Sequence, residues 1–152
     1  MGARMESMVV IERPVEEVFG FVLDLEKSLR LVDPDVESVK KTPEGPIGAG
    51  TTFWLRRDAR GRRREFTRYT AVEPNRKIEF KARFGPVAPT GSLTFEQANG
   101  GTRVTFRGDP NPVGPFKLFS LLIARKGQRA WDKRLTRIKT VLETPTASPG
   151  TL

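Results

Sequence analysis

Between residues 36 and 109 apolar and polar residues alternate, and this alternation constrains the fold more than any other feature of the sequence. Gly, Pro or Asn interrupts the pattern at intervals and divides it into short segments. Such alternation predicts strands with one buried and one solvent-facing side. A succession of them forms an antiparallel sheet, which curls because its strands twist. Six strands are expected: residues 36–41, 51–57, 62–72 and 78–84, one around Leu93 and Phe95, and one around Val104 and Phe106 after the hairpin signal Asn99-Gly100.

Helical patterns flank these strands. A first strand from Met8 to Glu12 leads to a helix that starts near Pro14, and a short second helix covers residues 25–32. A long helix follows the breaker-rich PNPVGP segment and ends near Glu143. Only this helix is long enough to cover the sheet, so we expect it to roof an interior volume. Its apolar residues recur every three or four positions, as on a buried helix face: Phe116, Phe119, Ile123, Trp131, Leu135, Ile138 and Leu142.

The first half of the long helix, PFKLFSLLIARKG, is apolar on nearly every side. We expect this half to face the curled sheet and the two short helices. Gly127 closes the stretch in the middle of the helix, where a glycine costs roughly 1 kcal/mol relative to alanine. We therefore expect the absent side chain of Gly127 to leave room in the interior.

Length and composition fit one domain, which we place at residues 8–143, with flexible termini at 1–7 and 144–152. The chain has no cysteine and no histidine, which excludes disulfides, thiolate chemistry and the commonest general base and metal ligand. We expect no metal and no cofactor. The longest apolar run is far shorter than the roughly 20 residues of a membrane-spanning helix. No signal peptide is recognisable at the N-terminus, so a cytoplasmic protein is expected.

Several short stretches resemble a known superfamily. They are ERPVEEVFGFVLDLEKS, GAGTTFWL, YTAVEPNRKIEF and the last helix ending in KTVLE. Together with the element order, they resemble the SRPBCC (START/Bet v 1-like, polyketide cyclase/dehydrase) superfamily. The resemblance implies an α+β helix-grip fold, in which a curved antiparallel seven-stranded sheet wraps around a long C-terminal helix, with two short helices after strand 1. It also implies a deep apolar cavity for lipids, polyketides or other hydrophobic molecules. Many relatives have an aromatic residue in the second short helix, where this chain has Leu29, Leu31 and Val32.

The inward side of the predicted strands supplies the candidate ligand-binding residues. Apolar residues at this spacing form either a solid core or the lining of a cavity, and the resemblance favours the cavity. Phe66 and Tyr69 are three residues apart and so lie on opposite faces of a regular strand. Either one of them is exposed or the strand contains a bulge. The candidates are Phe53, Leu55, Thr67, Tyr69, Phe80, Ala82, Leu93, Phe95 and Phe106 on the strands, and Ile123, Gly127 and Trp131 on the long helix.

Basic residues dominate the charge, with a formal net charge of +9. A predicted hairpin tip, RRDARGRRR, holds Arg56, Arg57, Arg60, Arg62, Arg63 and Arg64. The tip is either a solvated loop or a transient contact with an anionic membrane surface. Nucleic acid is a weaker candidate partner, because few aromatic residues are interleaved with the arginines. A second basic set, on the long helix, is expected to face solvent: Lys126, Arg129, Lys133, Arg134, Arg137 and Lys139.

Catalytic groups are few. The plausible acid–base residues near the sheet are Asp24, Glu65, Tyr69, Glu79 and Glu96, and no pair has the spacing of a catalytic dyad. Tyr69 is the one candidate for cyclase-like chemistry. The sequence favours a non-catalytic carrier or sensor that binds a hydrophobic small molecule or lipid. The alternatives are a polyketide cyclase/dehydrase-like enzyme and a toxin-like interaction protein that acts through its basic surface.

Overall fold

A computed structural model describes residues 4–57 and 64–144. Seven strands and three α-helices follow one another, with a 3-10 helix before the last α-helix. Their order is β1 (Met5–Ile11), α1 (Val15–Leu23), α2 (Leu25–Val32), β2 (Ser38–Thr42), β3 (Thr52–Arg56), β4 (Arg64–Glu73), β5 (Lys77–Arg83), β6 (Thr90–Ala98), β7 (Gly101–Asp109), η1 (Gly114–Phe119) and α3 (Ser120–Glu143).

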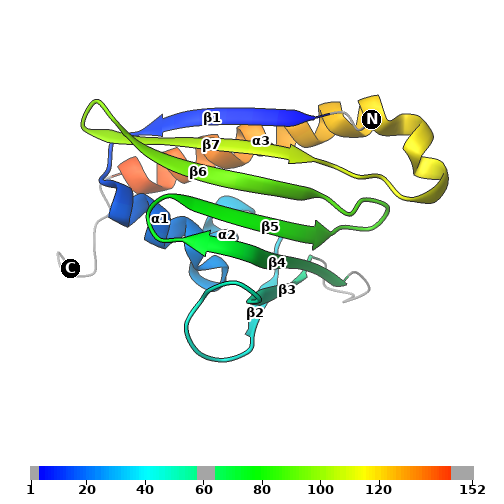
Figure 1. The fold of residues 1–152 in the computed structure, drawn as a ribbon, viewed down its shortest axis with the longest axis horizontal. Coiled ribbons are helices and arrows are strands. Elements are labelled where there is room, and N and C mark those ends of the chain that lie inside the picture. Colours follow the sequence, from blue (N-terminus) through cyan, green and yellow to red (C-terminus); the bar gives the residue numbers. More distant parts are fainter. Residues whose placement is uncertain (1–3, 58–63, 145–152) are drawn as a thin grey trace.

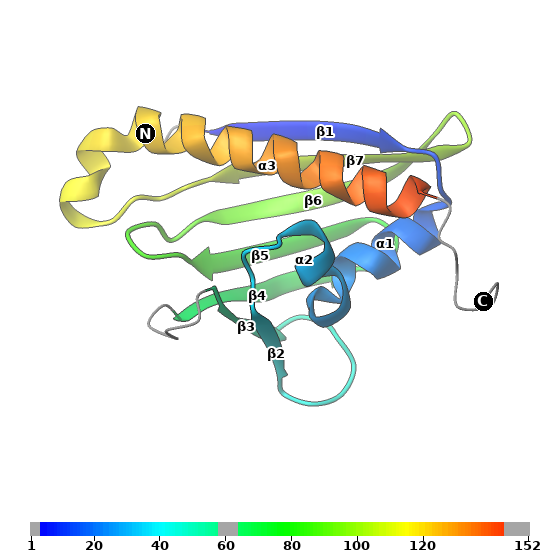
Figure 2. The same cartoon turned by 180° about the vertical axis from the view of Figure 1, so that it is seen from behind.

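The strands form one antiparallel sheet in the order β1-β7-β6-β5-β4-β3-β2. Each strand from β2 to β6 pairs with the next strand along the chain, and β1 pairs with β7. All three α-helices lie on the same face of this sheet, toward the viewer in Figure 2. The prediction of a seven-stranded helix-grip fold is confirmed.

Two local features of the sheet follow from the sequence. Asn99 and Gly100 have φ values of 47° and 82°, as a two-residue hairpin turn with the strand twist requires. In β4 the pairing with β5 shifts between Tyr69 and Ala71, so Thr70 lies in a bulge. Phe66 points to the outer face and packs on Trp54, with ring centroids 5.5 Å apart. The expected bulge is therefore present, and the outward-facing Phe66 ring is half-buried rather than exposed.

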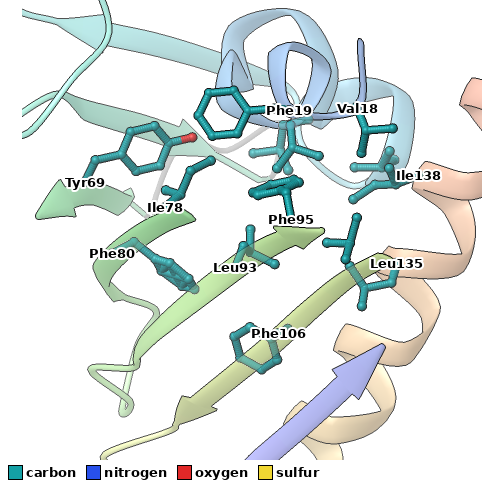
Figure 3. Packing of buried hydrophobic residues seen from close by; sticks show 14 of the residues in the cluster. Val18, Phe19, Tyr69, Ile78, Phe80, Leu93, Phe95, Phe106, Leu135 and Ile138 are labelled. Atoms are coloured by element: carbon teal, nitrogen blue, oxygen red, sulfur yellow. The ribbon is translucent and has the colours of Figure 1, made fainter. Parts of the chain in front are cut away.

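One end of the inner face is packed solid. Phe19 of α1 meets Phe95 of β6 edge to face, with ring centroids 5.1 Å apart. Leu135 and Ile138 of α3 are buried in the same cluster, as Figure 3 shows. The amphipathic pattern of α1 accounts for this packing, because its buried residues are spaced by three and four: Val15, Val18, Phe19 and Val22.

The second half of α3 is fastened to the sheet edge at β1. Lys139 Nζ donates to the Val10 carbonyl over 2.6 Å, and the Glu12 amide donates to Glu143 Oε2 over 2.7 Å. Ser7 Oγ donates to Asp132 Oδ1 over 2.5 Å. The helix therefore lies along β1 and β7. The part of β4 and β5 that α1 and α2 do not cross has no helix over its inner face (Figure 2).

Two predictions about the ends of the domain need correction. The strand β1 begins at Met5, although residues 1–7 were expected to be flexible, because Met5 and Ser7 are buried against α3. The start of α3 was expected to pack on the sheet, but η1 and the first turns of α3 project past the strands (yellow in Figure 1). The other residues predicted to be flexible, 1–3 and 145–152, lie outside the described residues.

Candidate functional site

A pocket of about 660 Å³ lies between η1 and α3 on one side, the strands β3 to β7 on another, and the short helices α1 and α2. Its size is within the range of roughly 300–1,000 Å³ that is usual for small-molecule sites. The pocket is partly open, and the exposed rings of Phe116 and Phe119 line it, so it reaches the surface beside η1. Of the three apolar α2 residues singled out in the sequence, Leu29 lines the pocket, while Leu31 is exposed.

All but two of the predicted ligand-binding residues line this pocket. The exceptions are Phe53 and Phe95, which lie behind the lining. Phe53 packs on Tyr69 with ring centroids 5.2 Å apart, and Phe95 packs on Phe19. The residues that line the pocket are Leu55, Thr67, Tyr69, Phe80, Ala82, Leu93, Phe106, Ile123, Gly127 and Trp131.

Three stacked aromatic rings form one side of the pocket. The Trp131 ring lies parallel to that of Phe106, with centroids 3.8 Å apart and planes 9° apart. Phe80 continues the stack, 5.9 Å from Trp131 and 6.2 Å from Phe106. Figure 3 shows Phe80 and Phe106 on the inner face of β5 and β7. Since these flat faces come from three different elements, the stack fixes the distance of α3 from the sheet.

Gly127 does not create the open space that the sequence suggested. A Cβ at this position would overlap the Sδ of Met5, which reaches across from β1. The glycine instead permits β1 and α3 to approach closely, with the Met5 side chain in the gap. Both residues border the pocket, so the Met5 side chain takes up part of the space beside the helix.

A chain of four charged side chains forms a polar wall that sequence reasoning missed. Arg57 Nε donates to Glu65 Oε1 over 2.6 Å, and Arg57 Nη1 donates to Asp33 Oδ2 over 2.8 Å. Arg134 Nη2 reaches the same Asp33 oxygen at 3.5 Å. Arg57, Glu65 and Arg134 line the pocket. The sequence did contain a signal for this wall. Arg57 lies two residues from Leu55, and Glu65 lies two residues from Thr67, so strand alternation places both charged side chains on the inward side with those residues.

The two arginines of this wall differ in how well they are paired. Burial lowers the pKa of Arg57, but its hydrogen bonds to Glu65 and Asp33 outweigh burial and raise the pKa overall. Burial lowers the pKa of Arg134, and Asp33 offsets this only in part. In the part of the chain that the structure describes, Asp33 is the one hydrogen-bond partner of Arg134. The guanidinium of Arg134 also lies 5.0 Å from the Trp131 ring centroid, and Arg134 lines the pocket.

Comparisons with known proteins agree with this architecture. A family described as "Polyketide cyclase / dehydrase and lipid transport" matches residues 2–143. The chain belongs to this family. No curated protein matches the sequence, so the family assignment rests on the match over residues 2–143.

Solved structures share the fold at low sequence identity. The crystal structure of Ara h 8.0201 is 14% identical, with a TM-score of 0.72 over 95% of this chain and 100% of that one. DynU16, from the dynemicin biosynthetic locus, is 18% identical, with a TM-score of 0.67 over 93% of this chain and 47% of that one. Aha1 from Colwellia psychrerythraea, solved as a dimer, is 14% identical, with a TM-score of 0.67 over 95% and 98%. At these identities the likeness extends to the fold alone.

Tyr69, the candidate catalytic residue in this polyketide cyclase/dehydrase-family chain, is engaged elsewhere. Its hydroxyl donates to the Leu23 carbonyl over 2.7 Å. Burial raises the pKa of Tyr69 far above its usual range, and the nearby carboxylate of Asp24 raises it further. The hydroxyl therefore keeps its proton at neutral pH, and that proton is already shared with the backbone. The geometry gives Tyr69 a structural role at the end of α1.

The predicted basic surface is only partly what the sequence suggested. Arg56 is exposed on the outer face of β3, but Arg57 points inward into the ion-pair chain. Arg134, expected on the solvent side of α3, lines the pocket. Arg60, Arg62 and Arg63 lie outside the described residues, as does the side chain of Arg64. Of the remaining acidic candidates, Glu96 is exposed and Glu79 pairs with Lys77 at 2.7 Å.

Neither a metal centre nor a membrane-spanning helix is found in the described residues. No group of three or more acidic side chains gathers there in a way that would hold a metal ion. None of the helices in that part of the chain combines the length and hydropathy needed to cross a bilayer.

Proposed function

We propose that this protein binds a hydrophobic small molecule or lipid in the pocket beneath α3 and acts as a cytoplasmic carrier or sensor. The observation that carries the proposal is the partly open pocket of about 660 Å³, whose lining is aromatic and aliphatic apart from a few polar groups. A pocket of this composition stabilises a ligand by removing apolar surface from water, at about 25 cal/mol per Å² before the costs of association.

The charges around the pocket favour one polar group on the ligand. Three cations and one carboxylate line it: Arg57, Lys126, Arg134 and Glu65. Arg57 is hydrogen-bonded to Glu65 and Asp33, whereas Arg134 has a single, longer contact with Asp33. Arg134 is therefore the donor best suited to bind a carboxylate or another acceptor. The proposed ligand is therefore an elongated apolar molecule with an acidic or carbonyl group at one end.

The alternatives have less support. A cyclase or dehydrase needs a side chain that exchanges a proton with the substrate, and Tyr69 is hydrogen-bonded to the backbone instead. The interaction-protein alternative depends on the 56–64 arginines, most of which lie outside the described residues. Arg57, which was expected at the hairpin tip, is committed to Glu65 and Asp33.

Native mass spectrometry tests the proposal. We expect a lipophilic adduct on the purified protein, or complex formation with an added long-chain fatty acid. Ala82→Trp, inside the pocket on β5, should abolish the adduct. Ala71→Trp is the matched control, because Ala71 pairs with Glu79 on the outward side of β4 and β5. A bare protein that takes up no lipophilic ligand, or equal loss of the adduct in both folded variants, would overturn the proposal.

A further inference from the structure

The end of the molecule beside the pocket opening carries a cluster of exposed apolar side chains. Phe116 and Phe119 are 45% and 53% exposed, and Leu118, Leu121 and Leu122 are 87%, 72% and 62% exposed. Figures 1 and 2 show that η1 and the first turns of α3, which carry these residues, project past the strands. Scattered exposed apolar residues are ordinary, but a contiguous cluster marks an interaction site.

Basic residues accompany this cluster, and the segment that carries it contains no carboxylate. Between Asp109 and Asp132 the sequence has no acidic residue and four basic ones, Lys117, Arg125, Lys126 and Arg129. All four are exposed. We call these cations, together with Phe116, Leu118, Phe119, Leu121 and Leu122, the η1–α3 surface.

We propose that the η1–α3 surface docks on an anionic lipid bilayer. Helical segments with Phe and Leu beside Lys and Arg lie in the plane of the membrane interface, with the apolar side chains among the acyl chains. Each basic residue close to an anionic leaflet strengthens the attraction to that surface. The proposal replaces the hairpin of residues 56–64 as the membrane-contacting element.

Charge favours a bilayer over a protein groove as the occupant. The i, i+3, i+4 spacing of Leu118, Leu121 and Leu122 suits a bilayer interface and a helix-binding groove alike. The four exposed cations of the η1–α3 surface complement an anionic leaflet. A second copy of the chain is disfavoured as occupant, because two molecules of net charge +9 repel each other.

The η1–α3 surface lies next to the pocket opening, so docking would also affect the pocket. Phe116, Phe119 and Lys126 belong to the η1–α3 surface and also line the pocket. A docked molecule would therefore turn the pocket opening toward the lipid. The docking itself does not depend on an occupied pocket, so the two proposals can fail separately.

Vesicle flotation tests the docking. Wild-type protein should float with phosphatidylcholine vesicles that contain phosphatidylglycerol and bind phosphatidylcholine alone more weakly, with the difference reduced at high salt. The double variant Leu118→Glu/Leu121→Glu should lose about tenfold or more in vesicle affinity, since it removes two apolar side chains from the buried face and adds two negative charges. Leu31→Glu on α2 is the matched control, because Leu31 is 60% exposed on another element, and it should bind as wild type does.

Further variants distinguish docking from ligand uptake and from self-association. The pocket-filling variant Ala82→Trp should still bind vesicles, because docking does not require an open pocket. Three results would overturn the proposal: vesicle affinity unchanged in the double variant, equal loss in Leu31→Glu, or loss only when Arg62, Arg63 and Arg64 become Gln. A wild-type dimer that the double variant converts to a monomer in the absence of lipid would also overturn it, in favour of a second copy.

Discussion

The first half of α3 is its more apolar half, yet it is the half whose large side chains are exposed. Leu121 and Leu122 are 72% and 62% exposed, whereas Leu135 and Ile138, in the charge-rich second half, are 1% and 4% exposed. The second half lies along β1 and is hydrogen-bonded to it. The first half extends beyond the sheet, with the pocket opening beside it. Apolar composition alone therefore does not predict burial, because burial also requires a surface opposite the side chain.

The largest expected effect compares the same substitution in the two halves. Leu135→Ala should lower the free energy of unfolding by about 3 kcal/mol, because it removes buried surface and leaves a cavity. Leu121→Ala should change it by less than about 0.5 kcal/mol, since an exposed side chain loses little. Urea unfolding of both variants measures the difference. Equal destabilisation would mean that the first half of α3 is packed in solution, contrary to the structure.

The boundary between the two halves is the contact of Gly127 with Met5. Gly127→Ala should displace the Met5 thioether toward the pocket and weaken binding of a fatty-acid probe several-fold. Stability should change by less than about 1 kcal/mol, because the gain in helix propensity offsets the displacement of a flexible side chain.

Adding Met5→Ala to Gly127→Ala supplies the control, since the smaller side chain makes room for the new methyl group. Probe affinity, measured by fluorescence titration, should recover in the double variant. An unchanged affinity in Gly127→Ala alone would show that the Met5 side chain moves away from the pocket rather than into it.

The smallest expected effect concerns the attachment of the last turn of α3 to β1. Hydrogen bonds from Lys139 and from the Glu12 amide lower the pKa of Glu143 below its usual value. A lowered folded-state pKa stabilises the fold above the unfolded-state pKa, and this contribution disappears as the pH falls through the folded-state pKa. Glu143→Gln should therefore be slightly less stable than wild type at neutral pH and equal to it in acid.

Thermal unfolding across pH checks this expectation, with Glu96→Gln as the control because Glu96 is exposed on β6. A deficit in Glu143→Gln that persists unchanged into acid would contradict the assigned pKa direction.

Local pattern predicted most of the fold and part of the pocket. Alternation places Leu55, Phe80 and Phe106 on the inner face, and Asn99-Gly100 marks the hairpin between β6 and β7. The sequence could not show where the sheet ends relative to α3, because helix periodicity is the same over a sheet and beyond it. The Met5–Gly127 contact escaped prediction because it joins residues far apart in the chain.

The charged wall escaped prediction for a related reason. Its four members come from the end of α2, the end of β3, β4 and α3, so no single segment contains the pattern. Arg57 was placed in the arginine-rich hairpin tip and Arg134 on the solvent side of α3, because arginines are usually exposed. Only the fold brings Asp33 and Glu65 close enough to pair with them.

The most direct test of the central claim, that the pocket beneath α3 binds a hydrophobic molecule, uses the chain's two tryptophans. Trp131 lines the pocket, whereas Trp54 lies on the outer face of the sheet, packed on Phe66. A brominated fatty acid quenches tryptophan only at short range. We expect it to quench the fluorescence of the Trp54→Phe variant, in which Trp131 remains, and to leave that of Trp131→Phe unchanged. Quenching of Trp54 alone, or of neither tryptophan at saturating probe, would contradict the account.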